Sequence, residues 1–172
     1  GFVGSKSGFD PAAKADYQAA RRIAVTTYSN LFNINPFFDT PNIIIADDAH
    51  ASENYIASMW SLQIRRRDPQ HATLHGVLAE LLRPLLSQTD LGRLTGQVDH
   101  GLVDVSWVEK IPTPAFSQIA SEFAALLDQH VPGIDDLQYT WRLLRDNLQG
   151  CNLYLTPNEI LLRPLIPPTW TH

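Results

Sequence analysis

Cysteine is almost absent from this sequence, and its scarcity excludes several kinds of site. Cys151 is the only cysteine in 172 residues, so the chain by itself forms no internal disulfide, no cysteine-rich zinc site and no iron–sulfur cluster. Long apolar runs are missing as well: none approaches the roughly 18 residues of a membrane span, and no segment has the pattern of a signal peptide. We therefore expect a cytoplasmic protein in a reducing setting, without a membrane partner.

Basic residues are also fewer than acidic ones, 13 against 18. The formal net charge is −5, which gives no global attraction to nucleic acid. This net charge argues against a simple DNA-coating protein. A protein that moves along nucleic acid needs only a local strip of positive charge, even when its overall charge is negative. The densest basic run, Arg65-Arg66-Arg67, falls at the predicted end of a helix, and we interpret it as a solvated helix terminus rather than a phosphate contact.

The phosphate-binding loop G-x-x-x-x-G-K-[ST] does not occur in the 172 residues. Gly4-Ser5-Lys6-Ser7 contains the residue types that hold a triphosphate, but Gly1 precedes Lys6 by five positions rather than six, and Ser5 stands where the second glycine belongs. We interpret this stretch as a glycine–serine turn.

Two short β-prone runs in the first third of the chain predict a parallel sheet. Residues 43–46 are apolar on both faces, as a central strand of such a sheet requires, and residues 23–27 form the second run. The link between them is long enough for a crossover, so the two strands can be parallel neighbours. Before them, Asp10-Pro11 predicts the start of a helix over residues 12–22.

From residue 52 onward the sequence predicts mostly helices. Apolar side chains recur at helical spacing in residues 52–64, in residues 77–86 with a break at Pro84, in residues 113–131 and in residues 137–148. The spacing places Trp60 and Trp141 in the core. Residues 91–101 predict a loop, and residues 152–155 and 160–163 predict a hairpin.

Two histidines have the spacing of metal ligands. His71 and His75 lie four residues apart on a predicted helix, where two imidazoles can bind one ion. No third ligand lies nearby in the sequence, so we interpret them as solvent-facing histidines rather than a metal site.

The string IIIADDAH, residues 43–50, leads an apolar run directly into two carboxylates. A buried strand would deliver Asp47 to the carboxyl edge of a parallel sheet, the edge at which open α/β sheets bind ligands. Mg²⁺ takes one or two carboxylates together with phosphate oxygens, which makes Asp47 a candidate ligand. Asp48 is a candidate for orienting the water in phosphoryl transfer. From these residues alone, a helix N-terminus capped by two acids is the alternative.

Residues 47–50, D-D-A-H, resemble the D-E-x-H box of the DEAD/DEAH group of superfamily 2 helicases. The resemblance implies that Asp47 holds Mg²⁺, that Asp48 orients the attacking water, and that His50 couples ATP hydrolysis to strand movement. Asp48 occupies the glutamate position and is shorter by one methylene, roughly 1.5 Å of reach. The attacking water must then sit closer to the backbone, or hydrolysis is slower.

Residues 25–31, V-T-T-Y-S-N-L, resemble the V-x-T-P-G-R-L segment of the same family, which contacts the nucleic-acid backbone. The resemblance implies that Thr27, Ser29 and Asn30 contact DNA or RNA. The arginine of the family segment is missing here, so one of its contacts has no counterpart.

The resemblance implies a domain organisation for the whole chain. Residues 1–60 would be part of an α/β, RecA-like ATPase domain of the P-loop NTPase type. Residues 61–150 would be a mostly helical insertion placed like the arch of the XPD and DinG helicases, without their four iron–sulfur cysteines. Residues 151–172 would be strands that return to the ATPase domain.

The implied cofactors are ATP and Mg²⁺, and the implied partners are nucleic acid and the remainder of a parent helicase. Because the sequence has no phosphate loop, we expect that loop to precede residue 1 and expect these residues alone to be inactive. The alternative is a helical protein-interaction module in which D-D-A-H is a structural cap and no nucleotide is used.

Overall fold

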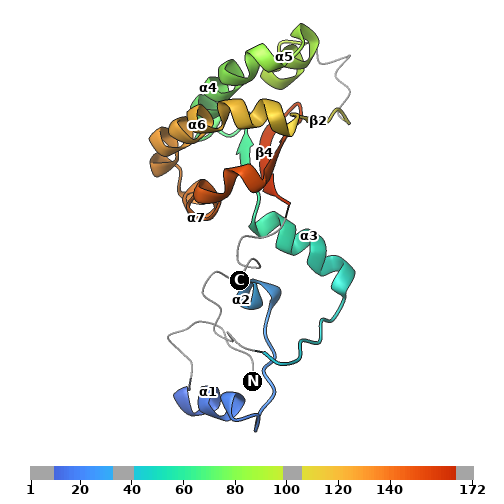
Figure 1. The fold of residues 1–172 in the computed structure, drawn as a ribbon, viewed down its shortest axis with the longest axis vertical. Helices are drawn as coiled ribbons and strands as arrows, with labels where there is room; N and C mark the ends of the chain where they lie inside the picture. The colour runs from blue at the N-terminus through green and yellow to red at the C-terminus, as the bar shows by residue number, and fades with distance from the viewer. Residues whose placement is uncertain (1–9, 33–40, 99–105, 166–172) are drawn as a thin grey trace. The chain divides into compact units, whose positions relative to one another are not determined.

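The computed structural model describes residues 10–32, 41–98 and 106–165. The chain divides into two compact units, Gly1–Met59 and Trp60–His172. Together the described parts form a mixed α/β protein, drawn in Figure 1 with its α-helices and some of its strands labelled.

The described residues of the first unit form the helices α1 (Pro11–Gln18), α2 (Tyr28–Leu31) and α3 (Ala49–Met59). The predicted start of the first helix is confirmed, because the Asp10 carboxylate accepts a hydrogen bond from the Ala12 N–H at 2.9 Å and Pro11 occupies the first helical position. The helix ends at Gln18, earlier than predicted, and Ala20 adopts a left-handed φ of 57° shortly after it.

The predicted strands of the first unit are not present in the structure. Residues 23–27 and 43–46 have no helix or strand assignment, and Ile43 and Ile45 are 81% and 92% exposed. An apolar run shows that a segment can be buried, but a strand exists only where a neighbour takes its backbone hydrogen bonds. Among the described residues of this unit no such neighbour occurs, so the parallel sheet is not shown.

The second unit is built on a four-stranded antiparallel sheet with the order β1-β4-β3-β2. Its strands are β1 (Leu62–Arg65), β2 (Glu109–Lys110), β3 (Cys151–Leu155) and β4 (Glu159–Pro164). The predicted hairpin is confirmed: β3 pairs with β4 in antiparallel register. Its turn is closed by the Thr156 hydroxyl, which accepts from the Glu159 N–H at 3.1 Å.

Strand β1 replaces part of a predicted helix. Helix α3 ends at Met59, and Leu62 and Ile64 are fully buried while Gln63 and Arg65 alternate with them. Burial of every second residue is typical of a half-buried strand. The sequence-based prediction missed it because Ile56, Trp60 and Ile64 are also four residues apart, which is a helical spacing. Arg65-Arg66-Arg67 therefore lies on and after a strand, not at a helix end.

Helices and short 3₁₀ turns cover one face of the sheet, and Figure 1 shows several of them around β4. In chain order they are α4 (Ala72–Leu82), η2 (Arg83–Leu85), α5 (Gln88–Thr95), α6 (Thr113–His130), η3 (Val131–Gly133), α7 (Asp135–Leu144) and η4 (Arg145–Gly150). The predicted break at Pro84 is confirmed, since α4 gives way there to the 3₁₀ turn η2.

Helix α5 extends to Thr95, so it includes the first part of residues 91–101, which were predicted to be a loop. Ser87 caps it by accepting from the Asp90 N–H at 3.1 Å, and Gly96 ends it with a left-handed φ of 73°. Leu91 and Leu94 are buried on one side of it. The polar composition of residues 91–101 outweighed these capping signals in the sequence-based prediction.

The core lies between the helices and the inner face of the sheet. Phe116 and Phe123 on α6 meet edge to face, with ring centroids 5.4 Å apart, and the predicted core positions of Trp60 and Trp141 are confirmed. Asp128 on α6 joins this helix to α7 and η4, because its carboxylate accepts from the Trp141 indole N–H at 2.9 Å and from the Arg145 guanidinium.

The strands predicted to return to an ATPase domain are found in the second unit. Strands β3 and β4 share their sheet with β1 and β2. Residues 166–172 lie outside the described residues, so the predicted return of the chain, like the role of residues 61–150 as an insertion, stays a prediction.

Truncation of the core should destabilise the second unit. Phe123→Ala removes a side chain with no exposed surface and its edge-to-face partner contact. We expect the free energy of unfolding to fall by about 3–5 kcal/mol in urea titrations followed by tryptophan fluorescence. Gln118→Ala, on the exposed side of the same helix, is the matched control and should stay within about 0.5 kcal/mol of the unmodified protein. Equal effects of the two changes would contradict this account of the core.

Candidate functional site

The two acids of the D-D-A-H string lie in a bend that leads directly into α3. The Asp47 and Asp48 side chains are exposed, and so is His50 in the first turn of the helix. Asp48 has a left-handed φ of 49°, a conformation that aspartate adopts more readily than most non-glycine residues. The string therefore turns an extended segment into a helix and leaves two carboxylates accessible from solvent.

The second predicted segment also ends at a helix. Thr27 is the N-cap position of α2, and its hydroxyl shares a hydrogen bond of 2.9 Å with the Ser29 hydroxyl. The Asn30 N–H donates to the Thr27 carbonyl at 3.1 Å. Thr27 is exposed, while Ser29 and Asn30 are half-buried. Of these three residues Thr27 is the exposed one, and its hydroxyl is hydrogen-bonded to that of Ser29.

The structure brings these two segments together. The Tyr28 hydroxyl donates a hydrogen bond to the Asp47 backbone carbonyl, and α2 lies beside α3. Both segments line one hollow of about 650 Å³, which Tyr17 and Tyr55 help to enclose. Residues 23–28 and 43–47 thus form a single local arrangement, even though the sheet predicted to join them is not seen.

The residues present meet only part of what a magnesium site needs. Mg²⁺ binds one or two protein carboxylates and fills its other positions with water and phosphate oxygens, and the exposed Asp47 and Asp48 satisfy that minimum. Among the described residues there is no group of three histidine, cysteine or acidic side chains placed to hold a metal by themselves. The stretch Gly4-Ser5-Lys6-Ser7, which contains the residue types of a phosphate-binding loop, lies outside the described residues.

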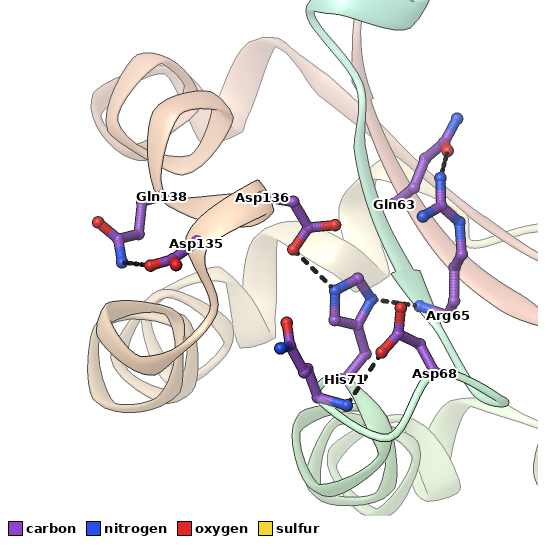
Figure 2. A network of polar contacts seen from close by, with 8 residues as sticks. Gln63, Arg65, Asp68, His71, Asp135, Asp136 and Gln138 are labelled. Atoms are coloured by element: carbon purple, nitrogen blue, oxygen red, sulfur yellow. Dashed lines mark hydrogen bonds and ion pairs between the residues drawn. The ribbon is translucent and has the colours of Figure 1, made fainter.

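Buried histidines occur elsewhere, where the sequence had indicated exposed ones. His71 has no exposed surface and His75 is only 3% exposed. Figure 2 shows the His71 ring between strand β1 and the start of α7. Its Nδ1 accepts from the Arg65 N–H at 3.1 Å, and its Nε2 lies 3.0 Å from an Asp136 carboxylate oxygen. Because Nδ1 accepts, Nε2 carries the proton and donates it to Asp136.

His75 lies one turn further along α4 and has a different environment. Its Nε2 is buried and has no hydrogen-bond partner in the described part of the protein. Burial, and then the positive charge of Arg66, lower the pKa of His75 from 6.5 to about 4. The side chain is therefore neutral at physiological pH and packs as a core residue.

The sequence contained the signal for both histidines. His71, His75, Leu78 and Leu82 follow one another at intervals of three or four residues, which is the buried stripe of α4. A histidine within such a stripe faces the core. The prediction of solvent-facing histidines was wrong because it considered their spacing from each other and not their spacing from the leucines.

Cys151 is not a candidate nucleophile. It is buried at the start of β3 and donates to the Asn147 carbonyl at 3.4 Å. Burial raises the pKa of the Cys151 thiol to about 12, so the reactive thiolate is scarcely populated at neutral pH.

Comparison with known proteins gave no match to any family model, curated protein or solved structure. Within the described ranges, no helix is both long and apolar enough to cross a membrane.

The lowered pKa of His75 predicts an acid-dependent stability. Between pH 6.5 and about 4 the unfolded chain binds a proton at His75 and the folded chain does not. The His75 contribution is therefore complete above pH 6.5 and is lost as the pH falls toward 4, by up to about 3 kcal/mol. Urea unfolding between pH 7 and pH 4 should show this slope, and His75→Gln should reduce it. His130→Gln, at the end of α6, should leave it in place; an unchanged slope in His75→Gln would refute the assignment.

Proposed function

We propose that this chain is part of an ATP-dependent nucleic-acid helicase or translocase of the DEAD/DEAH-box group. The observation that supports the proposal is the association of its two motif-like segments. Residues 25–28 of V-T-T-Y-S-N-L and Asp47 of D-D-A-H line one hollow, and the Tyr28–Asp47 hydrogen bond joins the two segments. In the resembled family these segments belong to one ATPase domain, so their proximity agrees with the resemblance.

Each candidate residue has a role in this proposal. Asp47 supplies a carboxylate to Mg²⁺, and Asp48 holds the water that attacks the terminal phosphate. His50, one residue into α3, links the acids to a helix that can transmit movement. The exposure of all three side chains supports these roles, because nucleotide and metal have to reach them.

Nucleic acid would lie along the other segment. The Thr27 hydroxyl, the Ser29 hydroxyl and the Asn30 side chain are neutral hydrogen-bonding groups of the kind that contact phosphate and sugar without reading sequence.

We further propose that residues 23–27 and 43–46 become parallel strands when the remaining strands of a RecA-like sheet are present. Two features support this: both segments lie outside any helix, and both carry exposed aliphatic side chains, among them Val25, Ile43 and Ile45. Such side chains gain about 1.5–3 kcal/mol each when buried. The phosphate loop that the sequence lacks would come from polypeptide outside these 172 residues.

The decisive measurement is ATP turnover by the natural protein that contains this chain, with and without single-stranded DNA or RNA. Asp47→Asn should lower turnover by about 100-fold or more, since a metal ligand supplies several kcal/mol of transition-state stabilisation. Asp10→Asn is the matched control: it makes the same chemical change, but asparagine caps α1 as well as aspartate does. Unchanged turnover in Asp47→Asn would exclude Asp47 as the metal carboxylate.

Substitutions of Asp48 separate its role from a structural one. Asp48→Asn should abolish turnover, whereas Asp48→Glu restores the length of the family's acid and should equal or exceed the unmodified rate. If both variants retain full activity, or if the unmodified protein hydrolyses no ATP, the alternative of a protein-interaction module without nucleotide chemistry is favoured. The exposed aliphatic side chains at residues 43–45 would then belong to a partner interface.

A further inference from the structure

The sheet of the second unit has an outer face that the core does not use. Alternation along the strands sends Leu62, Ile64, Leu153, Leu155, Ile160 and Leu162 to the buried side. The intervening residues lie on the opposite face. They are Gln63 and Arg65 on β1, Glu159, Leu161 and Arg163 on β4, Asn152 and Tyr154 on β3, and Lys110 on β2. Asn152 is buried, so the accessible part of this face is formed by the other residues.

Cations outnumber acids on this outer face. Arg65, Arg163 and Lys110 are exposed, and Glu159 is the one acid among the strand residues there. Among the described residues, Arg163 and Lys110 form no ion pair. The Arg65 guanidinium donates to the Gln63 side-chain oxygen at 2.9 Å, and Arg65 lies directly opposite Glu159 in the sheet. Figure 2 shows Gln63 and Arg65 on the side of β1 away from His71. The face is locally basic on a chain of net charge −5.

An aromatic ring lies among these cations. Tyr154 is half-buried on the inner strand β3, where it pairs across the sheet with Leu161 on one side and Lys110 on the other. Residues directly opposite have Cβ atoms about 4.5–5.5 Å apart, and diagonal neighbours such as Tyr154 and Arg163 about 7–8 Å. The Tyr154 ring thus has one cation within reach on each side, Lys110 on β2 and Arg163 on β4, and its other diagonal neighbour on β4 is the acid Glu159.

We propose that this outer face binds single-stranded nucleic acid. A base stacks on Tyr154 with Leu161 beside it, and Lys110 and Arg163 contact the phosphates on either side. A duplex does not fit this use of the face, because its bases are already stacked on one another, whereas an unpaired base can lie flat on an aromatic ring. An acidic peptide would satisfy the cations but would leave the tyrosine without a planar partner.

This inference goes beyond the proposed function and does not depend on it. None of its residues belongs to the D-D-A-H or V-T-T-Y-S-N-L segments, and no ATP hydrolysis is involved. Arg65, which belongs to the basic run that we interpreted from the sequence as a solvated helix end, lies on this outer face.

The test is fluorescence anisotropy of labelled 20-mers of deoxythymidine and uridine, titrated with the full chain at several salt concentrations. Tyr154→Ala should weaken binding about tenfold, the loss expected for one base–aromatic stack, whereas Tyr154→Phe should bind like the unmodified protein. Arg163→Gln should weaken binding and lower the magnitude of the log–log salt slope by about 0.7, the value for one phosphate contact on a single strand.

Arg142→Gln is the matched charge control. Arg142 is exposed on α7, away from the sheet face, and its loss should change neither affinity nor slope. Circular dichroism melts of each variant confirm that the fold is retained. The proposal is overturned if the unmodified chain does not bind either oligonucleotide, if Tyr154→Ala binds normally while folded, if Arg142→Gln weakens binding as much as Arg163→Gln, or if polyglutamate of matched length binds as tightly. Asp47→Asn is expected to bind normally, so failure of the ATPase assignment and failure of this inference are distinguishable.

Discussion

The second unit depends on the imidazole of His71, which has no contact with solvent and must find both its hydrogen bonds inside the protein. It accepts from the backbone N–H of Arg65 and donates to Asp136. Since β1 is at one edge of the sheet, the first bond occupies an edge donor that would otherwise be open to pairing with another chain. One side chain thus connects the edge strand to helices α4 and α7.

The two units differ in how completely they bury their apolar residues. In the second unit, Leu62, Phe123 and Leu162 have no exposed surface, and Asp128 links α6 to Trp141 and Arg145. In the first unit, the most apolar segment of the sequence is largely exposed at Ile43 and Ile45. Hydrophobic burial therefore accounts for the fold of the second unit. In the first unit, hydrophobic burial does not explain the conformation of residues 43–45, because their side chains stay exposed.

The candidate sites differ in the kind of evidence behind them. D-D-A-H is identified as a candidate by its resemblance to a sequence motif. The structure adds that its acids are exposed and that the Tyr28 hydroxyl donates a hydrogen bond from the upstream segment to the Asp47 carbonyl. The surface around Tyr154 has no motif. It exists because the register of three strands, β2, β3 and β4, places Lys110, Tyr154 and Arg163 near one another. No linear pattern brings residues from three strands together.

Local signals in the sequence determined the cap at Asp10, the break at Pro84 and the hairpin of β3 and β4, because each depends on a few neighbouring residues. Tertiary structure decided the rest. Whether residues 43–46 form a strand depends on a neighbouring strand, and whether residues 62–65 form one depends on pairing with β4, far along the chain. The burial of His71 likewise required Asp136 to approach from another helix. Hydrophobic pattern gives a segment the capacity to be buried, but only long-range packing supplies the partners.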